Sequence, residues 1–547
     1  MLVEGAYLHE FYQRSEGPLR MNERNSGSPR TRAGVFVDEP RAGVAKGLES
    51  FGAVVHAVAH VVEALSSGRE KASHGRGVTE GAQQLDEARP RAEEGLSHAV
   101  ARHFLTVYNL GSQGCRVPVD GRLQIVHRDS DVINIVQHDR TSPSDATARL
   151  GSRRRWTMTQ SLIVAARRTP VGKLNGALSS LPASDLGGVA VRALLADTGV
   201  DPARVDAVIM GQVLTAGVGQ IPARQAAVAA GIPMTTHATT LNKVCLSGLA
   251  ALRYGDLLVR SGEADVVVVG GMESMSRAPY LLPGARQGFR FGDVVALDSM
   301  THDGLTCAFD HCAMGAATET HAGGRISRAR QDEFAARSHA LALAARSRGA
   351  FDAELSPVTV TSRRGDSREE SLDEGVRADT SLESLGALRP AFDSDGTITA
   401  GNASQISDGA AALLLVSDSF ATQHDLRPLG ELVAYGEVAG PDTSLLHQPS
   451  RAIQAALAKT DVRLDDLRHV EINEAFAAVA LASLDDLGVD PTLVNPDGGA
   501  IALGHPIGAS GARLAVHALH ALEPGSYAAV ALCGGGGQGD GAILRRL

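Results

Sequence analysis

The chain has 547 residues, of which 44% are hydrophobic and 21% charged, a composition that excludes a wholly disordered or collagen-like protein. Its formal net charge of −10 argues against a general nucleic-acid binder, and its five widely spaced cysteines argue against a disulfide framework and favour reduced thiols in a cytoplasmic protein. The sequence predicts no membrane span and no secretory signal.

Residues 1–157 mix charged stretches with short apolar pieces and show no regular alternation of strands and helices. Three interpretations remain open for them: a weakly ordered appendage, a small accessory domain, or a start codon assigned too early. We favour the third, because nearly all basic residues are arginine, as in GC-rich coding sequence, where upstream reading frames tend to stay open. Met158 would then be the first residue.

From Ser161 the pattern becomes regular. Apolar runs predict strands at 161–170, 205–214 and 264–275, and helical spacing predicts helices at 185–198, 220–233 and 246–261. The last strand is continuously apolar, which is typical of a strand buried on both faces. This alternation predicts an α/β domain with a largely parallel sheet.

The second half of the chain repeats this pattern after an interruption. Residues 278–407 are loop-rich and polar, with their clearest helix at 331–348. After about residue 429 the order helix, glycine, strand around 508–535 resembles that around 246–271. We therefore expect two similar halves, formed by 158–277 plus 408–428 and by 429–547, with 278–407 as an inserted loop domain.

Two cysteines stand where strands end. Cys245 lies at a predicted strand-to-helix junction, where the helix N-terminus favours the nucleophilic thiolate; the alternative is a buried structural cysteine. Cys533 precedes glycines that permit close approach of a ligand and expose N–H groups to an oxyanion. The same glycine string also resembles a dinucleotide-binding loop, although that motif needs a following helix and the chain ends at Leu547.

Polar side chains in two further segments are candidates. His505 lies between glycines in a tight loop before a helix, and a neutral imidazole is a suitable base near pH 7. Asn473, followed by Glu474, comes after a strand and is interpreted either as an oxyanion donor or as a helix N-cap. Cys307, His311 and Cys312 cluster in sequence, but they lack a fourth ligand and a recognisable zinc spacing, so we expect no metal site.

Seven segments together resemble the thiolase family, in its acetyl-CoA acetyltransferase branch, over roughly residues 160–547: NKVCLSG, GGMESMS, GQIPARQAA, RPAFDSDGTITAGNAS, NEAFA, GGAIALGHPIGASG and CGGGGQG. The resemblance implies a layered α-β-α-β-α fold. It also implies reversible condensation of two acetyl-CoA molecules to acetoacetyl-CoA and CoA through an acetyl-cysteine, in fatty acid metabolism. No permanently bound cofactor or metal and no nucleic-acid or membrane partner is expected, and the family usually forms homotetramers or homodimers.

The resemblance assigns roles to individual residues. Cys245 would be the nucleophile, and His505 would accept its proton and help bind the thioester oxygen. Cys533 would remove the α-proton of the second acetyl-CoA. Asn473 would hold a water that forms one oxyanion hole with His505, while the backbone N–H groups of Cys245 and Gly535 would form the other.

The resemblance also implies a binding path for the coenzyme A thioester. Its residues are Arg377 at a phosphate, Phe392, Ala400 and Ser404 along the pantetheine and adenosine, Met314 and Phe476 at the acyl pocket, and Leu305. Two departures leave the preferred acyl chain open: Ala313 occupies a position where relatives commonly have histidine, and Cys307 replaces an acidic residue.

Other functions remain as alternatives. A degradative 3-ketoacyl-CoA thiolase acting on longer chains would share these motifs, whereas a ketoacyl synthase would not be expected to pair the Cys533 string with NEAFA. A non-catalytic CoA-binding protein would be expected to lack the nucleophile or the base. A redox dithiol protein is disfavoured because no Cys-x-x-Cys motif occurs.

Overall fold

The computed structural model describes residues 115–116, 124–126, 132–133 and 159–547, with residue 363 excepted. The contacts divide the chain into two units, Met1–Arg153 and Arg154–Leu547. In the first unit, the short strands β1 (Cys115–Arg116), β2 (Gln124–Val126) and β3 (Val132–Ile133) pair in that order as an antiparallel sheet. The remaining expectations for residues 1–157, and the early start codon, lie outside the described residues.

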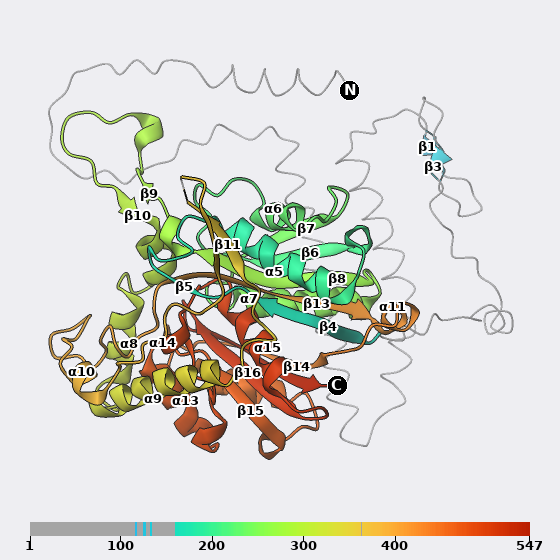
Figure 1. The fold of residues 1–547 in the computed structure, drawn as a ribbon. Coiled ribbons are helices and arrows are strands. Elements are labelled where there is room, and N and C mark those ends of the chain that lie inside the picture. Colours follow the sequence, from blue (N-terminus) through green and yellow to red (C-terminus); the bar gives the residue numbers. More distant parts are fainter. Residues whose placement is uncertain (1–114, 117–123, 127–131, 134–158, 363) are drawn as a thin grey trace, which may run out of the picture. The chain divides into compact units, whose positions relative to one another are not determined.

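A ten-stranded sheet runs through the second unit (Figure 1). Its first part has the spatial order β7 (His237–Leu241), β6 (Ala207–Gly211), β8 (Val266–Ser274), β13 (Ser407–Ser417) and β4 (Ser161–Arg168), with the short β5 (Gly172–Lys173) beside β13. The second part has the order β15 (Leu467–Ile472), β16 (Tyr527–Gly534), β17 (Gln538–Arg546) and β14 (Gly430–Ala439). The parts meet where Gly430 of β14 pairs with Ile163 of β4.

The two parts of the sheet repeat one topology. In the first, β6 and β8 are parallel while β13 is antiparallel to both β8 and β4. In the second, β15 and β16 are parallel while β17 is antiparallel to both β16 and β14. This confirms two similar halves, but the expectation of a largely parallel sheet is wrong. The short glycine turn between β16 and β17 reverses the chain, which forces an antiparallel pair.

Helices form three layers around the sheet. The outer helices are α5 (Ala183–Thr198) and α6 (Pro222–Ala229) on the first half and α12 (Gln448–Leu457) and α13 (Ala477–Leu487) on the second. Between the halves, α7 (Ser247–Ser261) packs against α15 (Ser510–Ala521), and both contribute to one apolar core that contains strands of each half. The result is the expected layered α-β-α-β-α arrangement.

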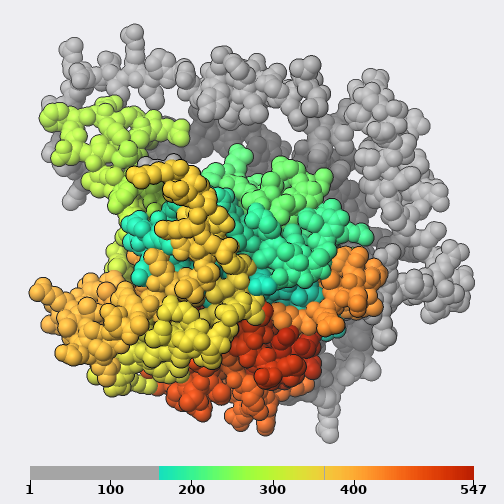
Figure 2. All heavy atoms as spheres, in the orientation of Figure 1, coloured from blue at the N-terminus to red at the C-terminus, as the bar shows by residue number. Residues whose placement is uncertain are grey.

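The inserted region carries shorter elements. They are β9 (Tyr280–Leu281), β10 (Leu297–Asp298), a π-helical turn (Met300–Leu305), α8 (Met314–Ala322), α9 (Arg328–Ser347), β11 (Val358–Thr361), β12 (Ser367–Glu370) and α10 (Leu382–Gly386). The segment between β9 and β10 stands out from the layered body as an arm (Figures 1 and 2). Short helices elsewhere are α11 (Asp418–Gln423), α14 (Ala500–Leu503), Pro202–Arg204, Met275–Arg277, Ala285–Gln287, Leu464–Asp466 and Pro491–Leu493.

Glycine ends two of the predicted helices. Gly199 follows α5 with φ of 67° and Gly262 follows α7 with φ of 74°, in the left-handed region that favours glycine. In the described part of the chain, no helix combines the length and apolar character that a membrane span requires.

Candidate active site

Cys245 lies in a tight turn between β7 and α7. Val244 has a φ of 51°, and its backbone N–H donates to the side chain of Asn242 at 3.0 Å. The Ser247 hydroxyl donates to the Val244 carbonyl at 2.6 Å and accepts from the Lys243 backbone at 2.8 Å. These bonds hold the strained turn, which places Cys245 directly before the first turn of α7.

The electrostatic environment of Cys245 differs from the sequence-based expectation. Although part of its surface is accessible, burial raises the pKa of the Cys245 thiol to about 12. The backbone N–H groups of Cys245 and Gly535 lower this pKa, as expected at such a turn, and the Glu273 carboxylate raises it. Burial is the larger effect, so the expectation of a resting thiolate is wrong. To act as a nucleophile, this thiol would have to lose its proton to a neighbouring base.

Cys533 lies at the end of β16, beside the same turn. Burial raises the pKa of its thiol, and the negative charge that Cys245 would carry raises it further. Since Gly535, two residues later, presents its N–H to the Cys245 sulfur, the two cysteines share one site. The dinucleotide-loop alternative is wrong, because the glycine turn leads into strand β17 rather than into a helix.

His505 and Asn473 form a buried pair. The imidazole Nε2 lies 3.4 Å from Asn473 Nδ2, and Nδ1 lies 2.6 Å from the Ser510 hydroxyl. That hydroxyl donates its only proton to the Pro506 carbonyl at 2.9 Å, so the His505 Nδ1 must carry a proton and Nε2 holds the free lone pair. Burial, aided by the Arg513 charge, lowers the pKa of His505 to about 3. The ring is therefore a neutral base at physiological pH.

Asn473 is joined to the strand that carries Cys533. Its backbone N–H donates to the Ala531 carbonyl of β16 at 2.9 Å, and its side-chain Oδ1 is buried with no partner within the described residues. The N-cap interpretation is wrong, because α13 begins at Ala477 with Phe476 at its N-cap position and no side-chain cap. Oδ1 is therefore available to a water or a ligand.

A cavity of about 300 Å³ opens onto His505. Five residues of the predicted binding path line it: Leu305, Met314, Phe392, Ser404 and Phe476. Ala313, named above as a departure from the family pattern, also lines the cavity. The other wall residues were not predicted from the sequence: Met275, Thr301, Gly315, Ala403, Gln405, Ile406 and Ile507. Mostly apolar residues carry no chemical signal in a sequence, which explains why they were missed. Such a wall suits a short acyl group and an uncharged pantetheine arm.

Two predicted residues lie elsewhere. Ala400 is exposed and is absent from the wall of this cavity. Arg377 lines a second cavity of about 350 Å³ together with His339, and its backbone N–H donates to His339 Nδ1 at 3.2 Å. Arg377 and Ala400 therefore do not line the cavity of His505, and their contacts with the substrate stay predictions.

Glu273 is a buried acid within the GGMESMS motif, and no role was predicted for it from the sequence. It stands at the end of β8 and accepts hydrogen bonds from the backbone of Val213 at 3.0 Å, Leu214 at 3.2 Å and Gly508 at 3.0 Å. Burial raises its pKa to about 7. Because Gly508 belongs to the loop that carries His505, Glu273 ties this loop to the central strand.

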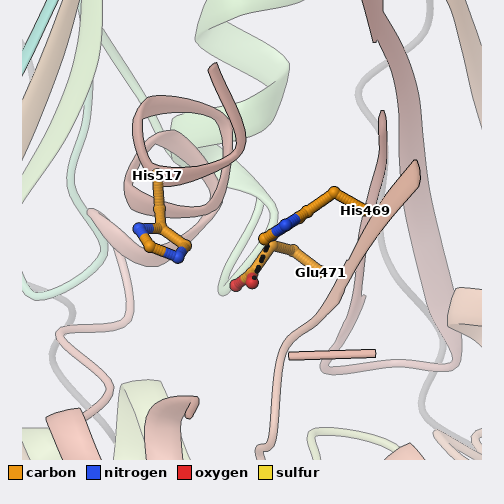
Figure 3. A group of neighbouring side chains, drawn as sticks. All are labelled: His469, Glu471 and His517. Atoms are coloured by element: carbon orange, nitrogen blue, oxygen red, sulfur yellow. Dashed lines mark hydrogen bonds and ion pairs between the residues drawn. The ribbon is translucent and has the colours of Figure 1, made fainter. Parts of the chain in front are cut away.

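The cysteine and histidine cluster near the cavity does not have the geometry of a metal site. The Cys307 thiol donates to Asp310 at 3.3 Å, and its backbone N–H donates to the Cys312 carbonyl at 2.8 Å. Among the described residues, the group whose potential ligand atoms do lie together is a different one, formed by His469, Glu471 and His517 (Figure 3).

Comparisons with known proteins agree with these motifs. The chain matches the thiolase N-terminal domain over residues 161–419 and the thiolase C-terminal domain over residues 426–546. It is 54% identical over 388 residues to a probable acetyl-CoA acetyltransferase of Mycolicibacterium smegmatis, covering 70% of this chain and 100% of the relative. It is 47% identical to an acetyl-CoA acetyltransferase of Chromobacterium violaceum, covering 70% and 99%. The crystal structure of the Bacillus anthracis acetyl-CoA acetyltransferase is similar with a TM-score of 0.69 and 38% identity, covering 72% and 100%.

Proposed function

This chain belongs to the thiolase family, and from that premise we propose that it is an acetyl-CoA C-acetyltransferase. It condenses two acetyl-CoA molecules reversibly to acetoacetyl-CoA and CoA, the activity that its relatives' names indicate. The proposal rests on two buried thiols that act on one another electrostatically, Cys245 and Cys533. It also rests on the neutral imidazole of His505, whose partner Asn473 is bonded to the strand that carries Cys533.

The first half-reaction acetylates Cys245. As the sulfur attacks the thioester carbon, its proton passes to Nε2 of His505; transfer and attack are coupled, because neither group is charged at rest. The bond from carbon to the CoA sulfur breaks, and the Cys533 thiol donates its proton to the departing CoA thiolate. The raised pKa of the Cys533 thiol keeps it protonated until this step, so that it has a proton to donate.

The second half-reaction forms the new carbon–carbon bond. The Cys533 thiolate left by the first step removes an α-proton from the second acetyl-CoA, and the resulting carbanion attacks the acetyl carbon on Cys245. The bond from that carbon to the Cys245 sulfur breaks, and His505 returns its proton to this sulfur. Each residue regains its starting state, and the net reaction is two acetyl-CoA giving acetoacetyl-CoA and CoA.

Fixed donors stabilise the developing oxyanions. A water held by the free Oδ1 of Asn473 would form one oxyanion hole with His505, and the N–H groups of Cys245 and Gly535 would form the other. A preorganised donor of this kind contributes roughly 3–4 kcal/mol to the transition state. These donors supply the stabilisation that the enolate needs when the base that forms it is only a thiolate.

The cavity supplies the binding path for the acyl and pantetheine groups. Met314 and Phe476 border the acyl end, and Leu305, Phe392 and Ser404 extend from it. We further propose that Arg377 faces a phosphate and that Ala400 contacts the outer part of the substrate. The enzyme would act in the cytoplasm as a homotetramer or homodimer without a permanently bound cofactor, and light scattering during gel filtration measures that assembly.

Acetyl labelling separates the two half-reactions. With labelled acetyl-CoA and peptide mapping, the wild-type protein should carry one label on Cys245, and Cys245→Ser should carry none. The Cys533→Ser protein should still accept the acetyl label on Cys245, but it should form no acetoacetyl-CoA. Cys115→Ser, which lies outside the family match, is the matched control and should behave as the wild type.

The preferred substrate length distinguishes the proposed acetyl-CoA C-acetyltransferase from a degradative 3-ketoacyl-CoA thiolase. Thiolysis of acetoacetyl-CoA should be faster than thiolysis of an eight-carbon 3-ketoacyl-CoA. A strong preference for the longer chain would replace the acetyl-specific proposal, and label on a residue other than Cys245 would overturn the mechanism.

A further inference from the structure

A buried cluster of ionisable side chains lies between α15 and β15 (Figure 3). His517 projects from α15, and His469 and Glu471 project from β15, with the Glu471 carboxylate between the two rings. Their potential ligand atoms lie within 4.8 Å of one another, which is close enough to hold a metal ion. None of the three residues belongs to the site described above.

Existing partners already occupy these atoms. One oxygen of Glu471 lies 2.9 Å from His469 Nε2, and the other lies 3.2 Å from Arg513 Nη1. A guanidinium bonded to the central carboxylate repels any incoming cation. The cluster is therefore better explained by an internal cation than by a metal.

His517 lies between two further carboxylates. Its Nδ1 is 3.0 Å from Glu354 Oε2, and its Nε2 is 3.3 Å from Asp497 Oδ2, an ion-pair contact that is not aligned as a hydrogen bond. An ionised carboxylate only accepts hydrogen bonds, so a neutral ring would turn a lone pair towards one of these oxygens in a buried position. Both ring nitrogens therefore carry protons.

With His469, the neighbour of Glu471, counted as uncharged, the charges of the surrounding network balance if the His517 ring is charged. The carboxylates are Glu354, Asp373, Asp497 and Glu471, and the guanidinium groups are Arg168, Arg348 and Arg513. Four anions thus face three guanidinium cations, and His517 supplies the fourth positive charge. In agreement, burial lowers the pKa of His517, but the carboxylates of Glu354, Asp497 and Glu471 raise it to a net value of about 10.

The network connects the segments that hold the proposed catalytic pair. Asp497 lies in the loop before His505, whereas His517 lies on the helix after it, and that helix begins at Ser510, the partner of the His505 ring. On the other side, Glu471 bonds Arg513 of the same helix and is followed two residues later by Asn473. A shift of α15 would therefore move His505 relative to Asn473.

We propose that His517, as a buried imidazolium held between Glu354 and Asp497, is a positioning residue that aligns His505 with Asn473. This inference rests on the proposed function for its kinetic consequence, but the charged state of the ring can be measured independently of any activity.

The kinetic test compares His517→Gln with His520→Gln. His520 is on the same helix, and among the described residues its ring hydrogen-bonds the Ala166 carbonyl at 2.8 Å and no carboxylate, so it is a matched control. With kcat expressed per acetylated Cys245, His517→Gln should lower kcat about 10- to 100-fold, as expected for misplaced catalytic groups, and should change KM for acetyl-CoA by less than about threefold. Asp497→Asn should give the same pattern, and His520→Gln should leave both constants near wild type.

The second test observes the ring itself. In wild-type protein labelled with ¹³C,¹⁵N-histidine, and with the signal assigned by correlating the ring with its own backbone, both ring nitrogens of His517 should remain protonated from pH 6 to pH 8. This spectrum is available even if the variants fail to fold.

Three results would overturn the inference: a neutral His517 tautomer at pH 7, wild-type kcat in both His517→Gln and Asp497→Asn, or one equivalent of zinc in the wild-type protein that is lost in His517→Gln. Failure of the proposed function would look different, because the wild-type protein itself would then form no acetoacetyl-CoA while the His517 spectrum stayed unchanged.

Discussion

The Ser510 hydroxyl accepts a hydrogen bond from Nδ1 of His505 at 2.6 Å, and this contact orients the imidazole. Since Ser510 is also the first residue of α15, the position of the base is set by the helix that packs against α7, at whose start Cys245 stands. The packing of two central helices therefore sets the positions of the proposed nucleophile and the proposed base.

Replacing Ser510 with alanine should slow the reaction without abolishing substrate binding. The His505 ring would lose the acceptor that fixes its tautomer, so we expect kcat for acetoacetyl-CoA thiolysis to fall about tenfold, equivalent to about 1.4 kcal/mol, with little change in KM. Ser261→Ala is the control, because its exposed hydroxyl makes only a local bond to the Leu258 carbonyl at 3.0 Å. Wild-type kcat in Ser510→Ala would show that this bond does not orient the base.

Glu273 should make stability depend on pH. Burial raises the pKa of the Glu273 carboxyl from its ordinary value of 4.5 to about 7 in the folded state, so the folded protein binds more protons than the unfolded chain between these values. The contribution of Glu273 to the free energy of unfolding is therefore present below about pH 4.5 and decreases as the pH rises through 7, by up to roughly 3 kcal/mol.

Urea unfolding at pH 5.5 and pH 8 measures this effect. Glu273→Gln resembles the protonated acid, so its free energy of unfolding should change less between the two pH values than that of the wild type. The exposed Glu383→Gln should show the wild-type dependence. An unchanged pH dependence in Glu273→Gln would contradict the prediction.

Candidate site residues could be chosen from the sequence, but their resting state could not be predicted. Cys245, Cys533, His505 and Asn473 were recognisable as candidates because each stands in a distinctive, mostly glycine-rich segment at the end of a strand or helix. The protonation of Cys245 was not, because helix position is visible in a sequence whereas burial depends on the assembled core.

Long-range contacts explain most of what was missed. The partners of His517 include Glu354 and Asp497, and Glu354 in turn contacts Arg168, far earlier in the chain. No local pattern connects such residues. The antiparallel direction of β13 was not predicted for a related reason. β13 and β8 both contain a continuous apolar run, which does not reveal strand direction, yet the two strands are antiparallel.

Close packing of α7 against α15 predicts that Gly248→Ala will be harmful. A Cβ at Gly248 would lie 2.8 Å from the Ala512 backbone nitrogen and 3.0 Å from the Gly508 carbonyl oxygen, and neither backbone atom can move freely. We expect a loss of about 1–3 kcal/mol in the free energy of unfolding, together with lower kcat, because the helices that place Cys245 and His505 would separate.

Gly386→Ala is the matched control for this substitution. Gly386 lies at the end of α10 with open space around its Cβ position, so alanine should be neutral or slightly stabilising. Urea unfolding and the thiolysis rate measure both variants. Equal stability of Gly248→Ala and the wild type would mean that the central helices tolerate separation at this point.

The cavity wall predicts a different kinetic signature for Phe392→Ala. The Phe392 ring packs edge-on against Phe476, with 6.1 Å between ring centroids, and covers Gly315 at the rim of the cavity. Removing it takes apolar contact from bound substrate but leaves the thiols and His505 in place. We expect KM for acetyl-CoA to rise about tenfold, equivalent to about 1.4 kcal/mol of lost binding, with kcat within about twofold of wild type.

Phe291→Ala is the control that tests whether the rise in KM comes from loss of the cavity wall. Phe291 is fully exposed on the arm between β9 and β10 and does not line the cavity of His505, so its replacement should leave both constants unchanged. Initial rates over a range of acetyl-CoA concentrations separate KM from kcat for the two variants. A fall in kcat with unchanged KM in Phe392→Ala would assign Phe392 to alignment of the reacting groups instead of substrate binding, because only a contact equally strong in the ground and transition states raises KM alone.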